Sequence, residues 1–113
     1  MGALALITPT STGTVSTGAA VAASDTIAQA LMGPRGLILE IINAGGSPDT
    51  VTISDAGLTP AGSAAAPPSD AVTAGTSQAF LISPTQVNPT TLVVTVTHTF
   101  TTSVTYKLYP NGL

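Results

Sequence analysis

A strict alternation of apolar and polar side chains near the end of this chain does most to limit its fold. From residue 92 to residue 100 every second side chain is apolar or is His98, and threonine fills most positions between them. The same period of two returns over residues 104–109. A period of two is typical of a β-strand with one buried face, whereas an amphipathic helix has a period of 3.6. We therefore expect two strands here, forming an antiparallel hairpin across the turn 101–103.

Two more strands are predicted in the centre of the chain. Residues 36–43 form a nearly continuous apolar run in which Glu40 is the one interruption. Such a run indicates a strand covered on both faces, in a sandwich core or at a subunit contact. Residues 50–54 alternate again, with their β-branched apolar side chains on the inner face. Because the glycine pair 45–46 lies between the two segments, we expect a strand–turn–strand unit.

Shorter strands and loops complete the pattern and favour an all-β fold. Residues 71–73 and 78–82 predict short strands, and the proline-rich stretch from 55 to about 70 predicts a surface loop. For residues 25–32 a short helix capped by Ser24 competes with a brief strand, and we favour the extended form. The fold class is thus a single β-sandwich or jelly-roll-like barrel. The mostly buried residues should be Leu39, Ile41, Val51, Ile53, Phe80, Val94, Val96, Phe100, Val104, Tyr106 and Leu108.

The first 24 residues differ from the rest of the chain. They carry no charge and no aromatic side chain, with a strand candidate at 14–17. Because so little bulky apolar surface cannot form a core alone, we predict an extended N-terminal arm over 1–24 and the β-sandwich domain over 25–113. We expect the arm to make mostly intermolecular contacts. The candidate contact residues are Leu4, Leu6, Ile7 and Val15 in the arm, and Tyr109, which faces the side opposite Tyr106.

Composition excludes several classes of protein. The 113 residues suit one domain, and only 6% of them are charged, with two Lys and Arg in total. So few cations leave no basic surface for phosphates, so we expect no nucleic-acid partner. The chain has no cysteine, which excludes disulfides and thiolate ligands. No run approaches the roughly 18 apolar residues of a membrane span, and no basic leader is visible. We expect no membrane contact and synthesis in the cytoplasm.

The titratable residues do not predict an active site. His98 is the sole histidine and lies in phase with apolar neighbours, which favours a partly buried structural role. A pair of converging carboxylates is not excluded, but the chain has no Trp to form a sugar platform. Asp49 and Asp55 stand where turn chemistry alone explains them. We therefore expect no enzymatic activity and no catalytic, cofactor-binding or metal-binding residues.

Five strand and turn segments follow one another in a recognisable order. They are Asp25-Thr26-Ile27, Gly33–Leu39, Ile42–Ile53, Val94–His98 and Thr102–Leu108. In this order the chain resembles the small β-rich head proteins of tailed bacteriophages, especially those of actinobacterial hosts, encoded beside the major capsid protein. The resemblance covers roughly residues 25 to 109 and rests on strand and turn patterns.

The resemblance implies a capsid decoration protein. Such proteins coat the outside of the capsid and bridge neighbouring capsomers, and the family has no catalytic residues to carry over. The implied partners are the major capsid protein and sister copies, as a homotrimer or alternatively a dimer, on the virion exterior after synthesis in the host cytoplasm. No cofactor is implied. Where such proteins often have charged or amide residues in their loops, this chain has many Ala and Thr.

Two other functions remain open at this point. The chain could be another virion structural protein, such as a tail-tube, neck or head-fibre protein. A carbohydrate-binding or adhesin-like β domain is the third possibility, and the absence of Trp counts against it. The symmetry of the assembly separates the first two, because tail proteins form rings around an axis, and a glycan-binding screen tests the third.

Overall fold

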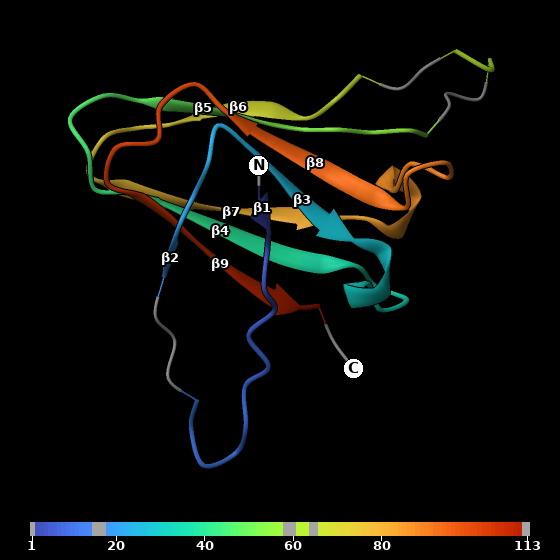
Figure 1. The fold of residues 1–113 in the computed structure, drawn as a ribbon, viewed down its shortest axis with the longest axis horizontal. Coiled ribbons are helices and arrows are strands. Elements are labelled where there is room, and N and C mark those ends of the chain that lie inside the picture. Colours follow the sequence, from blue (N-terminus) through green and yellow to red (C-terminus); the bar gives the residue numbers. More distant parts are fainter. Residues whose placement is uncertain (1, 15–17, 58–60, 64–65, 112–113) are drawn as a thin grey trace.

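The computed structural model describes residues 2–14, 18–57, 61–63 and 66–111, and these form a sandwich of two β-sheets (Figure 1). The strands are β1 Gly2–Ala3, β2 Ala19–Ala20, β3 Ser24–Ala28, β4 Leu37–Asn43, β5 Asp49–Ile53, β6 Ser69–Val72, β7 Thr76–Ile82, β8 Val93–His98 and β9 Val104–Pro110. One sheet has the order β1-β3-β8-β5-β6, and the other has the order β2-β9-β4-β7. Helix within the described ranges is limited to two single 3-10 turns, Gln29–Leu31 and Pro84–Gln86. The predicted all-β sandwich is confirmed.

The core lies between the two sheets and follows the alternation of the sequence. In β4 and β9 every second side chain is buried, because successive side chains of a strand point to opposite faces. Phe80 and Phe100 were expected to be buried with the others, but they are half-buried and pack against the edge of the core. The remaining nine predicted core residues are buried: Leu39, Ile41, Val51, Ile53, Val94, Val96, Val104, Tyr106 and Leu108.

The pairing of the strands differs from the two hairpins expected from the sequence. Strand β4 pairs with β7 and β9, whereas β5 pairs with β6 and β8 in the other sheet. Strand β8 likewise lies in the sheet opposite β9. The connections 44–48 and 99–103 are longer than the two-residue turns that join hairpin strands, and each crosses from one sheet to the other. The expected strand–turn–strand unit and terminal hairpin are therefore wrong.

Gly45 lets the first crossing connection pass close to the second. A Cβ atom at this position would lie 2.4 Å from a ring carbon of Phe100 and 2.4 Å from the carbonyl oxygen of Thr102. No side chain fits in that space, because real Cβ atoms do not approach other heavy atoms so closely. The glycine pair in the sequence thus marks a crossing between sheets and a close approach of two loops, rather than a hairpin turn.

The N-terminal stretch packs against the body of the same chain. Strand β1 pairs parallel to β3 at the edge of one sheet, and β2 pairs antiparallel to β9 at the edge of the other. Between them, Leu4 enters the core and is only 6% exposed. The backbone N–H of Ala5 donates to the Tyr106 hydroxyl at 2.9 Å, and that of Ile7 donates to the Leu108 carbonyl at 2.7 Å. This stretch closes the side of the sandwich between β3 and β9.

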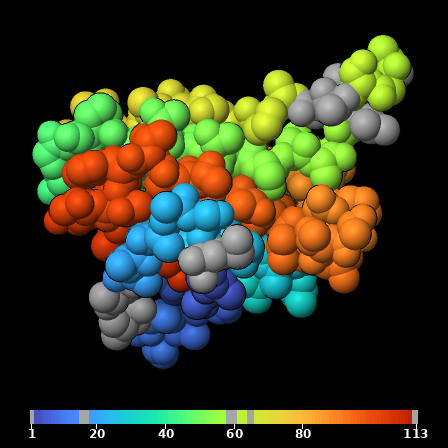
Figure 2. Space-filling model, turned by 45° about the horizontal axis from the view of Figure 1, so that its top comes forward, coloured from blue at the N-terminus to red at the C-terminus, as the bar shows by residue number. Residues whose placement is uncertain are grey.

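Two loops extend beyond the sheets. Residues 8–14 are exposed throughout and reach away from the body, as Figure 1 shows. Residues 61–63 of the proline-rich loop are also exposed, and Figure 2 shows them projecting at one end of the molecule. The strand candidate at 14–17 lies outside the described residues from 15 onward. Of residues 25–32, the part up to Ala28 is extended, as we favoured, but Gln29–Leu31 form a 3-10 turn, so the expectation is wrong there.

Candidate functional site

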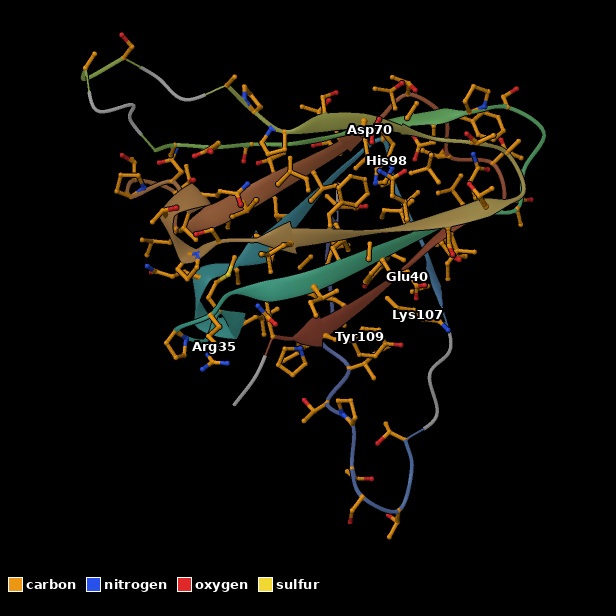
Figure 3. All side chains as sticks on the ribbon, turned by 180° about the vertical axis from the view of Figure 1, so that it is seen from behind. Arg35, Glu40, Asp70, His98, Lys107 and Tyr109 are labelled. Carbon is orange, nitrogen blue, oxygen red and sulfur yellow. The ribbon has the colours of Figure 1, made fainter. Side chains whose placement is uncertain are left out.

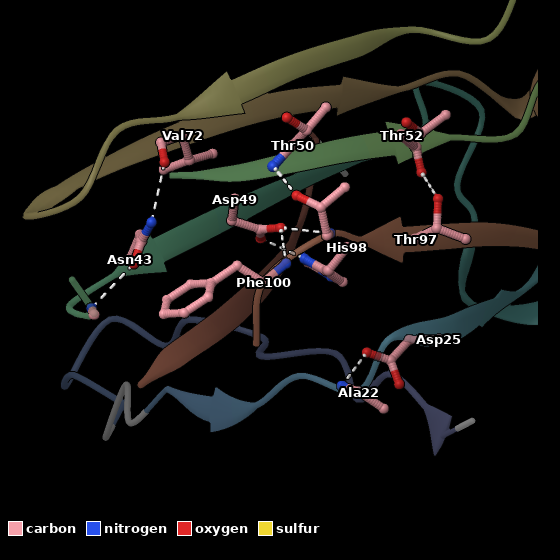
Figure 4. A network of polar contacts seen from close by, with 12 residues as sticks. Ala22, Asp25, Asn43, Asp49, Thr50, Thr52, Val72, Thr97, His98 and Phe100 are labelled. Carbon is pink, nitrogen blue, oxygen red and sulfur yellow. Dashed lines mark hydrogen bonds and ion pairs between the residues drawn. The ribbon is translucent and has the colours of Figure 1, made fainter. Parts of the chain in front are cut away.

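The most buried polar contact joins the neighbouring strands β5 and β8. His98 is the last residue of β8 and Asp49 is the first of β5. His98 Nδ1 lies 2.6 Å from Asp49 Oδ2, and the two side chains are 1% and 0% exposed. The second oxygen, Oδ1, accepts the backbone N–H groups of Thr99 at 3.0 Å and Phe100 at 3.2 Å (Figure 4). One carboxylate therefore fixes the point where the chain leaves β8 for the other sheet.

A histidine paired with a carboxylate also supplies two of the three groups of a catalytic triad. A triad requires a hydroxyl or thiol nucleophile within hydrogen-bond reach of the second ring nitrogen, and access for a substrate. The described residues show no hydroxyl hydrogen-bonded to the His98 ring, and the ring is sealed from solvent. The contacts of this pair therefore stabilise the junction after β8.

The three roles predicted for His98, Asp49 and Asp55 have different outcomes. The predicted burial of His98 is confirmed. The interpretation of Asp49 as a turn residue is wrong, because its partners are backbone groups and a ring that lie about 50 positions along the chain. Asp55 does make a local turn contact, since its Oδ1 accepts the backbone N–H of Gly57 at 2.8 Å.

Two further buried polar side chains hold connections in place, and nothing local in the sequence pointed to either. Asn43 Nδ2 donates to the carbonyl of Ser47 at 2.8 Å and to that of Val72 at 3.0 Å, which ties the first crossing loop to β6. Asp25 accepts the backbone N–H groups of Gly2 and Ala22 and so holds both ends of the N-terminal stretch. Their partners lie 3 to 29 positions away, and the two distant ones, Gly2 for Asp25 and Val72 for Asn43, are brought close only by the fold.

The outer surface of the five-stranded sheet carries hydroxyl side chains and is named the hydroxyl face. None of the residues that define it is charged. Thr52 lies opposite both Thr97 and Ser69 across the sheet, and its Oγ1 lies 3.0 Å from Ser69 Oγ. Ser54 Oγ accepts the backbone N–H of Thr95 at 2.8 Å. The hydroxyls named here thus bond to the sheet itself. The hydroxyl face consists of Ser24, Thr26, Thr50, Thr52, Ser54, Ser69, Thr95 and Thr97, together with the apolar Ala28, Ala71 and Val93.

The outer surface of the four-stranded sheet is different, and we name it the apolar face. Its centre is a cross-strand pair, Glu40 on β4 directly opposite Lys107 on β9, which Figure 3 shows side by side. On one side of that pair, Ile38 lies between Leu81 and Tyr109. Leu81 is 64% exposed. On the other side of the pair, Ile42 lies between Ser77 and Thr105. The apolar face consists of Ile38, Glu40, Ile42, Ser77, Ala79, Leu81, Thr105, Lys107 and Tyr109.

The structure places the candidate contact residues in three different settings. Leu4 was expected at an intermolecular contact, and this is wrong. Its side chain is buried by this chain's own residues, so it is not available to a partner. Leu6 and Ile7 are half-buried, and Leu6 packs against the core. Tyr109 points away from the core, opposite Tyr106, as predicted, and belongs to the apolar face. Val15 lies outside the described residues.

In the described part of the chain, no group of three or more His, Cys, Asp or Glu side chains is placed to hold a metal ion. The helical turns of the described residues are all too short to cross a membrane. Comparison of the chain with protein-family models, with curated proteins and with solved structures finds no match. The proposals below therefore draw on the sandwich and its two outer faces.

Proposed function

We propose that this chain is a capsid decoration protein, which binds the outer surface of the major capsid lattice of a tailed bacteriophage and stabilises the head by bridging capsomers. One observation carries the proposal: the sandwich presents two broad outer faces, one neutral and hydroxylated and the other largely apolar. Its best-buried acid and its histidine are used inside, to hold the chain. The molecule therefore offers surfaces for docking on other proteins.

The physical chemistry of a capsid surface suits such a molecule. A face without charges, such as the hydroxyl face, loses less solvation when it is covered than a charged one does, so it favours close contacts over long-range steering. A domain of 113 residues makes only small contacts with each neighbour, and attachment through several of them at once multiplies weak affinities. Sister copies, as a trimer or a dimer, would supply that multiplicity. In this proposal the exposed loop 8–14 is one further place for contacts with the capsid protein.

Electron microscopy of intact particles tests the proposal. Particles should be compared from the phage that carries this reading frame and from a derivative that lacks it. We expect two-layered density of this size at fixed positions outside the shell, lost in the derivative and restored when the purified chain is added. The derivative should also release its DNA at a lower temperature.

Other locations would overturn the proposal. Density in a ring around the tail axis or at the neck would assign the chain to another virion part. Its absence from particles, together with a specific signal in a glycan-binding screen, would favour the carbohydrate-binding function instead.

A further inference from the structure

We propose that the apolar face is the contact surface for a second copy of this chain, in a dimer whose two-fold axis runs along the strands between β4 and β9. The dimer is a property of the chain in solution, so its failure would leave the capsid proposal standing. Three features carry the inference, namely the side chains on the outer side of β4, the placement of the charges and the size of the face.

The outer side of β4 carries apolar side chains on a face that lies outside the layer between the two sheets of the described residues. Ile38 and Ile42 point away from the core and are half-buried by their neighbours on the same face. Leu81, opposite Ile38, is 64% exposed. An antiparallel sheet with one solvated face normally alternates apolar side chains inward with polar ones outward, and a larger apolar patch indicates an interaction site. The apolar run that covers both faces of β4 therefore predicts a partner on the outer face.

The charges on this face identify the partner as a second copy. Glu40 and Lys107 lie at the same level on adjacent strands. A two-fold axis along the strands and midway between β4 and β9 exchanges these two positions. It places Glu40 of each copy over Lys107 of the other, giving two charge pairs at the centre of the contact. The same rotation brings Ile38 of each copy over Tyr109 of the other, and Ile42 over Thr105, because the members of each pair also share one level.

Other ways of stacking two copies are disfavoured by the same charges. A two-fold axis in the plane of the contact but across the strands, at the level of Glu40, would place Glu40 over Glu40 and Lys107 over Lys107. Like charges in contact at an interface act against such a pairing. The face is therefore complementary to itself in one orientation, and complementarity of this kind is what a symmetric dimer requires. Packed sheets with natural twist would cross at roughly 30°.

The size of the face predicts a weak dimer. Strands β9 and β4, which overlie each other in this dimer, have seven residues each, so the shared contact is about 23 Å long and about 10 Å wide at usual strand spacings. A contact of that extent lies at or below the small end of specific interfaces. We therefore expect a concentration-dependent dimer in solution, which becomes effective when copies are held close together on a larger assembly.

Charge reversal tests the pairing directly. Sedimentation equilibrium of the full chain should show a monomer–dimer equilibrium at micromolar to millimolar concentrations. Glu40→Lys and Lys107→Glu should each weaken dimerisation at least tenfold, because each places like charges together twice per dimer. An equimolar mixture of the two variants should restore it, and so should the double variant E40K/K107E. Arg35→Glu, which also changes a charge but lies outside the apolar face, is the matched control and should have no effect.

The mixture makes the test independent of effects within one chain. Each variant also loses the cross-strand pair inside its own sheet, and mixing cannot restore that pair. Recovery of dimers by mixing is therefore expected only if the two positions meet between copies. A wild-type chain that stays monomeric at all these concentrations would overturn the proposal. So would single variants that dimerise like the wild type, or a mixture that stays monomeric. Thermal unfolding of every variant at low concentration verifies that it is folded.

Discussion

The two outer faces of this sandwich are built by the same rule and yet differ in character. In each sheet two central strands bury their inward side chains, β4 and β9 in one and β5 and β8 in the other, whereas the edge strands β6 and β7 bury only their last residues. On the hydroxyl face, Thr97 and Thr52 lie on neighbouring strands, and the Thr97 hydroxyl donates to the Thr52 carbonyl at 3.4 Å. On the apolar face, Ile38 and Leu81 lie on neighbouring strands with no polar group to offer. The inner faces are thus alike, and the outer faces carry the difference.

This difference shows where the sequence specifies folding and where it specifies association. Threonine is favoured in strands and tolerates water, so the hydroxyl face is stable without a partner. Isoleucine is equally favoured in strands, but leaving it exposed gives up the free energy that its burial would contribute. An outward isoleucine on a central strand therefore adds nothing to the core of its own chain. It stabilises the molecule only when a partner covers it.

The comparison of the two outer faces assumes that both sheets share one rigid interior. Of the substitutions considered, Asp49→Ala should destabilise that interior most. The substitution leaves two backbone N–H groups and the His98 ring without their buried acceptor. A buried donor that loses its acceptor costs roughly 1–3 kcal/mol, so the loss of this one carboxylate should cost roughly 3–5 kcal/mol in total. We expect the free energy of unfolding, measured by urea denaturation, to fall by about that amount. Asp55→Ala, which removes a local turn contact, should cost less than about 1 kcal/mol and serves as the control.

Leu4→Ala breaks the closure between the edges of the two sheets. Leu4 is 6% exposed and belongs to the main core cluster. Truncation of a buried leucine typically costs about 2–5 kcal/mol, and we expect the lower half of that range because the site lies at the side of the sandwich. Urea denaturation checks the free energy, and hydrogen exchange should rise first in β1 and β2. An unchanged free energy of unfolding would mean that the stretch contributes nothing to the fold.

Much of the fold was predictable because alternation is a local signal. The expected strands at 36–43 and 50–54 differ by one residue at their ends from the observed β4 and β5. The alternation of 104–109 likewise identified the buried side of β9. Which strands pair is a different matter, because a period of two says nothing about the sheet to which a strand belongs. The five-residue connections that cross between sheets were therefore mistaken for hairpin turns.

The buried polar contacts and the packing of the N-terminal stretch could not be predicted from local sequence patterns. Asp49 and His98 are 49 positions apart, and each has an adequate local explanation, as a turn residue and as an apolar-face histidine. Leu4 stands in a segment too poor in apolar residues to suggest a core, and its site exists only where β3 and β9 leave the side of the sandwich open. The apolar face is the exception, since the run 36–43 had already indicated cover on both faces.

Ile38→Thr places on the apolar face a residue type that is typical of the hydroxyl face, and so tests what the apolar side chain contributes to dimerisation. Threonine keeps the strand preference of isoleucine, so the free energy of unfolding at low protein concentration should change by less than about 1 kcal/mol. Dimerisation should weaken about tenfold, because roughly 1.4 kcal/mol of apolar contact is lost per dimer. Sedimentation equilibrium measures the second effect. A dimer of unchanged affinity would show that this end of the face is not in the contact.

The reverse exchange, T95V/T97V, should have the smallest effect. Valine matches threonine in size and strand preference, and the one bond that it removes, from Thr97 to the Thr52 carbonyl, is long and exposed. We expect unfolding to change by no more than about 0.5 kcal/mol. Self-association should also stay at the wild-type level, because apolar groups alone set no register and the hydroxyl face has no charges to match those of a second copy. A severalfold increase in the association constant measured by sedimentation equilibrium would contradict this. It would mean that the hydroxyls themselves keep the two faces different, and that Glu40 and Lys107 are less important to the choice of face than proposed.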